Sequence, residues 1–153
     1  GWRIGYLAAP EWIAKACNKV QGQVTSGTNA IAQRASIVAL RAPKSKIQYM
    51  IDEFLKRRNL VLQLLGEIEG LKLNVPEGAF YVFPDVSSFF GKTLRGRTIN
   101  NASDFSLYLL EEAGVATVTG EAFGDPKCIR LSYAASEEEL RKAIARIKES
   151  LQG

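Results

Sequence analysis

The stretch GEAFGDPKCIRLSYA, residues 120–134, decides the fold. A glycine-rich turn opens it, and the alternation over residues 128–133 predicts a β-strand. A period of two places Ile129 and Leu131 on one face and Arg130 on the other. The pattern therefore predicts a strand with one apolar face and a cation in the middle of its other face.

Arg130 is the residue of this stretch that most needs an explanation. A guanidinium in a half-buried strand is costly unless a carboxylate or a phosphate pairs with it. Its planar fork suits a carboxylate, which it binds through two parallel hydrogen bonds. Spacing alone favours an internal ion pair with Glu121 or Asp125 over a bound ligand, and leaves both interpretations open.

The pattern on either side of this stretch indicates an α+β fold with helices at its start. It predicts a strand over residues 3–8, a helix after Pro10, a loop over 21–29, a helix over 30–40, a long helix capped by Ser45, strands over 71–75, 79–83 and 115–119, a helix capped by Ser103 and ended by Gly114, and a last helix with the capping box Ser136 and Glu139.

Composition excludes several classes of function. With 153 residues, 46% of them hydrophobic, the chain is long enough for one ordinary globular domain. We expect no membrane span, because no apolar run approaches about 20 residues. The net charge is +4, and the lysines and arginines are spread over the predicted helices, apart from a short cluster over residues 92–97. This scatter argues against a nucleic-acid partner.

The absence of histidine limits the chemistry further. It excludes a Ser-His-Asp or Cys-His centre and the usual zinc sites within these residues, so no metal site is predicted. Cys17 and Cys128 make no disulfide framework, which indicates a reducing compartment and predicts a cytoplasmic protein.

Three further residues are weaker candidates for binding. Arg3 lies between Trp2 and an apolar stretch, where a fixed cation needs an anion unless it reaches the solvent. Ser26 has a hydroxyl that suits a phosphate or caps the next helix. Phe80 follows a Pro-Glu-Gly turn, and by itself an aromatic residue there is more typical of a core.

Taken together, the segments resemble the class I aminotransferases, pyridoxal-phosphate enzymes related to aspartate aminotransferase. The resemblance covers essentially the whole chain and rests on GWRIGY, QVTSGTNAIAQ, PEGAFYVFPD, the stretch over residues 120–134 and the terminal amphipathic helix. It implies the α+β small C-terminal domain of a fold-type-I enzyme, with a few-stranded sheet covered by a long helix and a terminal helix. Residues 1–28 would be a remnant of the large cofactor-binding domain, and residues 29–153 the small domain.

The resemblance also implies roles for the candidate residues. Arg3 matches the family's Gly-x-Arg arginine, which holds the phosphate of pyridoxal 5'-phosphate. Arg130 matches the arginine that holds the substrate α-carboxylate, so the resemblance reverses the interpretation favoured by spacing. Phe80 would wall the substrate pocket, and Ser26 would reach the cofactor phosphate of the neighbouring subunit of a homodimer.

The family's Schiff-base lysine would lie six residues before Gly1. No catalytic residue is therefore expected within these residues, and we expect the isolated chain to be inactive and not to hold the cofactor. The full-length protein would transfer an amino group between an amino acid and a 2-oxo acid. Gly22 stands where some members carry an arginine for a distal carboxylate, so recognition of a dicarboxylate cannot rest on that position.

Two other functions suit the same resemblance. One is a different pyridoxal-phosphate reaction, such as that of a decarboxylase, lyase or synthase, because a fold does not fix a function. The other is an aminotransferase-like effector-sensing domain of a transcription regulator. A helix-turn-helix ahead of Gly1 would favour the regulator, and a plain N-terminal arm would favour the enzyme.

Overall fold

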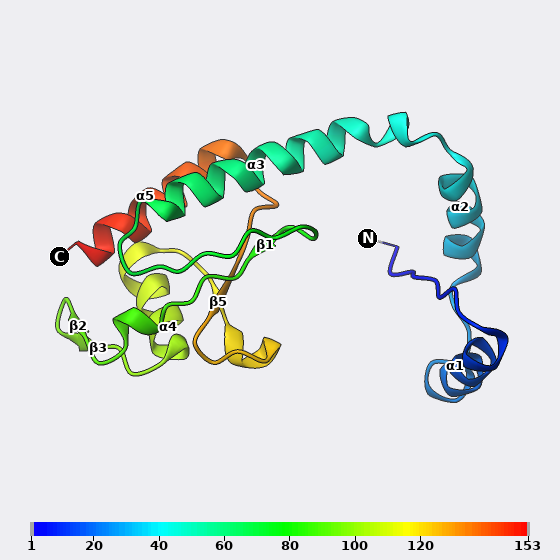
Figure 1. Cartoon of the computed structure of the whole chain (residues 1–153), viewed down its shortest axis with the longest axis horizontal. Helices are drawn as coiled ribbons and strands as arrows, with labels where there is room; N and C mark the ends of the chain where they lie inside the picture. Colours follow the sequence, from blue (N-terminus) through cyan, green and yellow to red (C-terminus); the bar gives the residue numbers. More distant parts are fainter. Residues whose placement is uncertain (1, 153) are drawn as a thin grey trace. The chain divides into compact units, whose positions relative to one another are not determined.

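The computed structural model describes residues 2–152 and contains both helices and short antiparallel strands, which confirms the predicted α+β class (Figure 1). Its elements are α1 (Glu11–Val24), α2 (Ala30–Arg41), η1 (Lys44–Lys46), α3 (Gln48–Gly66), β1 (Tyr81–Val82), η2 (Ser87–Phe89), β2 (Thr93–Leu94), β3 (Arg97–Thr98), α4 (Ala102–Ala113), β4 (Val118–Thr119), η3 (Gly120–Phe123), β5 (Ile129–Ser132) and α5 (Glu137–Leu151), where η marks a short 3₁₀ helix.

Contacts divide the chain into two compact units, Gly1–Gln48 and Tyr49–Gly153. The predicted boundary between residues 28 and 29 concerns the domains of a longer protein and stays a prediction. Within residues 2–152, no helix is both long and apolar enough to cross a membrane.

The first unit is built from α1 and α2. Pro10 precedes α1 as predicted, because a proline suits a helix start. The predicted strand over residues 3–8 is wrong: these residues form no strand, since the described chain offers them no partner strand to pair with. The predicted loop is also too long, because α1 continues to Val24.

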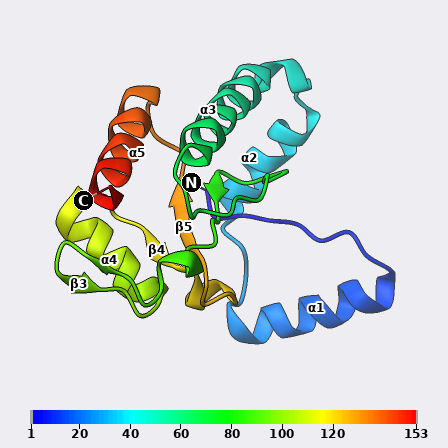
Figure 2. The ribbon, with the colours of Figure 1, turned by 60° about the vertical axis from the view of Figure 1, so that its left-hand side comes forward.

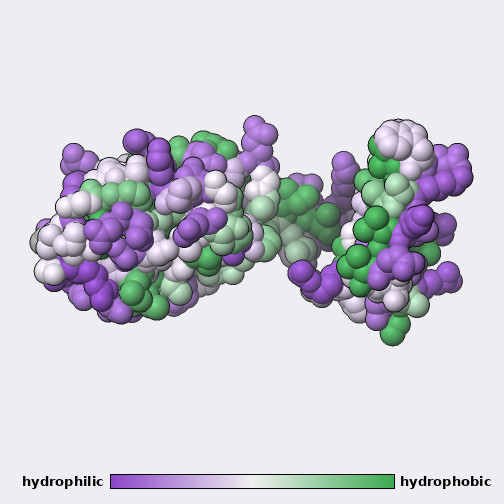
Figure 3. All heavy atoms as spheres, turned by 90° about the horizontal axis from the view of Figure 1, so that it is seen from below, coloured by the Kyte–Doolittle hydropathy of each residue, from purple (hydrophilic) through white to green (hydrophobic). Residues whose placement is uncertain are grey.

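The helix α2 matches its prediction closely and ends one residue later than expected. Asn29 caps it, since the Ala32 backbone N–H donates to the Asn29 side chain at 2.9 Å. Neither Ser26 nor Thr28 is therefore the cap. Apolar side chains of this unit remain exposed, and Figure 3 shows hydrophobic surface on it.

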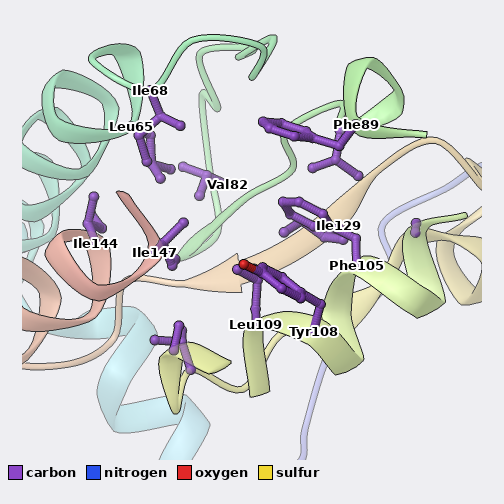
Figure 4. Close-up of a cluster of buried hydrophobic side chains, with 14 of the residues drawn as sticks. Leu65, Ile68, Val82, Phe89, Phe105, Tyr108, Leu109, Ile129, Ile144 and Ile147 are labelled. Atoms are coloured by element: carbon purple, nitrogen blue, oxygen red, sulfur yellow. The ribbon is translucent and has the colours of Figure 1, made fainter. Parts of the chain in front are cut away.

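The second unit holds the core. The sheet has the order β1-β5-β4 with antiparallel pairing, so β5 is the central strand. Figure 4 shows side chains from α3, α4, α5 and the strands pointing into one cluster. Its largest fully buried members include Leu65, Phe105, Tyr108 and Ile129.

The long helix and the terminal helix both contribute to this core, as predicted. In Figure 1 both helices lie on the same side of β1 and β5, and Figure 2 shows them as two separate helices. The long helix begins at Gln48 rather than after Ser45, because the residues around Ser45 form η1. Ser136 caps α5 and accepts a hydrogen bond from the Glu139 backbone N–H at 3.2 Å, which confirms that predicted cap.

The strands are shorter than predicted. Residues 71–75 contribute only an isolated bridge between Lys72 and Asp85, and residues 115–119 only the two-residue β4. The helix α4 begins two residues earlier than its predicted cap implied: Asn101, not Ser103, accepts from the Asp104 backbone N–H at 2.8 Å. Gly114 ends α4 as predicted, with a left-handed φ of 63°.

Candidate functional site

Arg130 lies on the central strand β5, half-buried and opposite Val118 of β4. Its guanidinium carbon lies 4.0 Å from the centroid of the Phe123 ring and 4.4 Å from that of Tyr81. Among residues 2–152, no carboxylate lies within 4.0 Å of its nitrogens. The ion pair with Glu121 or Asp125 is therefore not formed, and Asp125 instead accepts from the Lys127 backbone N–H at 2.9 Å.

The candidate residue Phe80 lies beside Tyr81, one of the two aromatic residues in contact with Arg130. Its side chain is 40% exposed, and its ring centroid lies 4.4 Å from that of Tyr81. The Tyr133 backbone N–H donates to the Phe80 carbonyl at 2.9 Å, and the Tyr133 hydroxyl donates to the Ala79 carbonyl at 3.0 Å. Phe80 is thus an exposed ring on a backbone that Tyr133, the residue after β5, holds in place.

The turn before β5 requires a glycine at its start. The Gly120 backbone N–H donates to the Cys128 carbonyl at 2.7 Å, and the Asp125 N–H donates to the Gly120 carbonyl at 3.1 Å. A Cβ on Gly120 would lie 2.3 Å from the Asp125 oxygen and 2.5 Å from the Cys128 oxygen. This close backbone approach sets the path of η3 and so places Phe123 beside Arg130.

Two ionisable groups near the turn have shifted pKa values. Burial is the main cause that raises the pKa of the Cys128 thiol to about 11, and the neighbouring Asp125 carboxylate adds to it. Hydrogen bonds from Ser87 hold the pKa of Asp85 below its ordinary value. Both shifts favour a fixed charge state at neutral pH, a neutral thiol and an ionised carboxylate, so neither group is poised to exchange a proton there.

In the first unit, Arg3 and Ser26 are exposed and both adopt a left-handed backbone, with φ of 53° and 62°. Arg3 lines an open hollow of about 660 Å³ together with Tyr6, Asn18 and Thr28. Ser26 is not among the described residues that line this hollow. The structure therefore brings Arg3 together with Thr28 rather than with Ser26.

Sequence reasoning missed Tyr81 and Phe123 as partners of Arg130. The signal for Tyr81 was present, because pairing of the two predicted strands in the right register brings an aromatic residue next to Arg130. Phe123 has no periodic signal, since it belongs to a turn. Within residues 2–152, no group of three or more acidic or cysteine side chains is arranged to hold a metal ion.

Comparison with known proteins identifies the family of this chain. The family model "Aminotransferase class I and II" matches residues 1–147. The chain belongs to this family. The predicted resemblance to the aminotransferases is thereby confirmed, and with it the predicted α+β fold class.

Named relatives of this aminotransferase chain are similar over nearly all of it. A bifunctional aspartate aminotransferase and glutamate/aspartate-prephenate aminotransferase from Petunia hybrida is 46% identical over 99% of the chain. The crystal structure of the aspartate aminotransferase from Rhizobium meliloti is 44% identical with a TM-score of 0.86. An aromatic aminotransferase from Pyrococcus horikoshii is 34% identical with a TM-score of 0.78.

The chain spans only about a third of these proteins. It covers 32% of the Petunia protein, 38% of the Rhizobium chain and 39% of the Pyrococcus chain. Statements about the activity, substrates and partners of a whole protein are therefore proposals.

Proposed function

We propose that the chain is part of a pyridoxal-phosphate-dependent aminotransferase that transfers an amino group between an amino acid and a 2-oxo acid. The observation that carries the proposal is the state of Arg130. Its guanidinium has no carboxylate partner within residues 2–152, although it lies half-buried on the central strand. Membership of the family and the names of the relatives support the same reaction.

Arg130 is proposed to bind the α-carboxylate of the substrate. A guanidinium presents parallel N–H donors that match both oxygens of a carboxylate, which fixes position and orientation together. Phe80 is proposed to wall the same pocket, since its ring is exposed and lies against that of Tyr81. An arginine that is already paired with a carboxylate of the protein would have fewer free N–H donors for a ligand.

The cofactor proposal rests on the first unit. Arg3 has no acidic side chain within 4.0 Å among residues 2–152. The hollow that it lines is also lined by Thr28, which carries a hydroxyl group. These groups fit a phosphate, because a guanidinium and a hydroxyl both donate hydrogen bonds to its oxygens. Arg3 is proposed to hold the phosphate of pyridoxal 5'-phosphate, which supplies an electron sink when bound.

Further parts of the proposal concern the full-length protein. Ser26 is proposed to reach the phosphate held by the neighbouring subunit of a homodimer, and its exposure leaves it free to do so. Residues 1–28 are proposed to belong to the large domain. The cytoplasm is proposed as the compartment, with no nucleic-acid or membrane partner.

The test is Arg130→Lys in a full-length protein that contains this chain, with aspartate as the first donor because the relatives' names specify it. Lysine keeps the charge but loses the paired donors, so kcat/KM is expected to fall. The expected decrease corresponds to a loss of about 2–4 kcal/mol in transition-state stabilisation. The melting temperature is expected to change little, because no internal carboxylate loses its partner.

Arg141→Lys is the matched control, since Arg141 is an exposed arginine on α5. It should change neither quantity. A large loss of stability in Arg130→Lys with near-normal kinetics would assign Arg130 a structural role and contradict the proposal.

A further inference from the structure

The guanidinium carbon of Arg130 lies over two aromatic rings. The ring centroids of Phe123 and Tyr81 lie 4.0 Å and 4.4 Å from its central carbon. Both distances are well inside the limit of about 6 Å for attraction between a cation and an aromatic ring. Tyr81 comes from β1 and Phe123 from η3, so two separate elements converge on one side chain.

The register of the sheet explains the position of Tyr81. Tyr81 pairs with Ser132 across the antiparallel β1–β5 ladder. Because side chains alternate along a strand, Ser132 and Arg130 point to the same face, and Tyr81 is the diagonal neighbour of Arg130 on that face. A shift of the register by one residue would turn Tyr81 away.

The position of Phe123 depends on the turn. Phe123 ends η3, which begins at Gly120, and the close approach of Gly120 to the Cys128 carbonyl ties the turn to the start of β5. The Phe123 ring also packs edge-on against Phe83, with centroids 6.4 Å apart and planes at 89°. It is nonetheless 48% exposed, so it is not a core residue.

Stacking on the faces of a guanidinium leaves the N–H donors at its edges available, because they lie in the plane of the group. It also restricts the tilt of that plane. A carboxylate that is to be bound by two parallel hydrogen bonds must lie in the same plane. Two rings stacked on the guanidinium of Arg130 would therefore set the plane in which a carboxylate has to approach it.

We propose that Tyr81 and Phe123 are positioning residues that hold the Arg130 guanidinium in the plane required to bind the substrate carboxylate. This inference rests on the proposed function of Arg130. It adds that the two rings act through the arginine. Loss of one ring would lower the affinity for the carboxylate, while the guanidinium keeps its charge and its donors.

The test uses Phe123→Leu in a full-length protein that contains this chain. Leucine keeps an apolar side chain at the site but has no aromatic face. The kcat/KM for the amino-acid donor is expected to fall about tenfold, mainly through a higher KM. Phe123→Tyr keeps the ring and is expected to restore kcat/KM to within about twofold of the parent.

Two further measurements separate positioning from a general loss of structure. Phe90→Leu makes the same chemical change at a half-buried residue packed against the core, and it should lower the melting temperature without raising KM. In the Arg130→Lys background, Phe123→Leu should have little further effect, because coupled residues give non-additive changes.

The outcomes also distinguish this inference from the proposed function. If Arg130→Lys lowers kcat/KM but Phe123→Leu leaves it unchanged, or lowers it equally in the Arg130→Lys background, the inference is overturned and the proposed function stands. If Arg130→Lys itself leaves kcat/KM unchanged, the proposed function fails. A lower kcat/KM in Phe90→Leu equal to that in Phe123→Leu would also overturn the inference.

Discussion

Replacing Gly120 with alanine should destabilise the chain more than any other glycine-to-alanine change at a residue without a positive φ. Gly120 is not among the glycines with positive φ, so the requirement is for space rather than for a special backbone angle. The added Cβ would lie 2.3 Å from the Asp125 carbonyl oxygen and 2.5 Å from that of Cys128. Both are backbone atoms, so the turn itself has to move to relieve the overlap.

The size of the effect follows from what that movement breaks. Two backbone hydrogen bonds hold the turn, from Gly120 to Cys128 and from Asp125 to Gly120, and each contributes about 1 kcal/mol. Crowding in a packed site adds about 1–3 kcal/mol. Alanine also lowers the conformational entropy of the unfolded chain relative to glycine, which offsets the loss of stability by about 0.4–1 kcal/mol. A net loss of about 2–4 kcal/mol is therefore expected.

The assay is urea unfolding of the chain followed by far-UV circular dichroism, with the free energy of unfolding taken by linear extrapolation. Gly66→Ala is the matched control, because Gly66 ends α3 and its added Cβ would meet only Leu73, at 4.0 Å. There the better helix propensity of alanine should leave stability unchanged or raise it by up to about 1 kcal/mol. A Gly120→Ala variant within about 0.5 kcal/mol of the parent would refute the reasoning.

Three other outcomes are expected. In the native chain at pH 8 the exposed Cys17 should react with a thiol reagent while Cys128 stays protected until urea unfolds it, because Cys128 is buried and its pKa is raised to about 11; equal reaction rates would contradict this. Ionised Asp85 accepts hydrogen bonds from Ser87, so its lowered pKa stabilises the folded chain at neutral pH, and this contribution is lost as the pH falls below its ordinary value of 3.8; the stability difference between the parent and Asp85→Asn should shrink in acid. Ser136→Ala removes the cap of α5 and should cost about 1 kcal/mol in urea unfolding, whereas an unchanged midpoint would show that the cap is dispensable.

Helices were the best predicted part of the fold, because their signals are local. The α5 pattern combines a capping serine with an apolar stripe, and Leu140, Ile144 and Ile147 are all buried as that stripe implies. The helix α2 lies between a polar loop and Pro43, which limits its ends. Caps were harder: Asn29 and Asn101 were missed because several neighbouring polar residues suit the same role.

Strands were predicted less well, because a strand exists only through a partner that is distant in sequence. Residues 3–8 have the apolar character of a strand but pair with nothing in the described chain. Residues 71–75 contribute only a bridge, since a single backbone pairing joins Lys72 to Asp85. The strand predicted over residues 128–133 is present as β5, because it pairs with a strand on each side.

The candidate site was predicted in part. The sequence identified Arg130 as a costly cation on a half-buried strand, and the structure places it there without an ionic partner in residues 2–152. What spacing alone favoured, a salt bridge to Glu121 or Asp125, failed because proximity in sequence does not determine the direction of a turn. The Asp125 carboxylate turns to the Lys127 backbone instead.

The fold and the proposed site share one constraint, which lies in the turn before β5. Gly120 joins the start of η3 to the residue that precedes β5, so the same hydrogen bonds that close the sheet also place the Phe123 ring. The register of β1 on β5 places the Tyr81 ring 4.4 Å from the Arg130 guanidinium carbon. The guanidinium is therefore positioned by the strand pairing and the turn that place the two rings, rather than by a carboxylate partner. Contact with two rings restricts the position of a cation and leaves its hydrogen-bond donors for a ligand, whereas an internal salt bridge uses those donors.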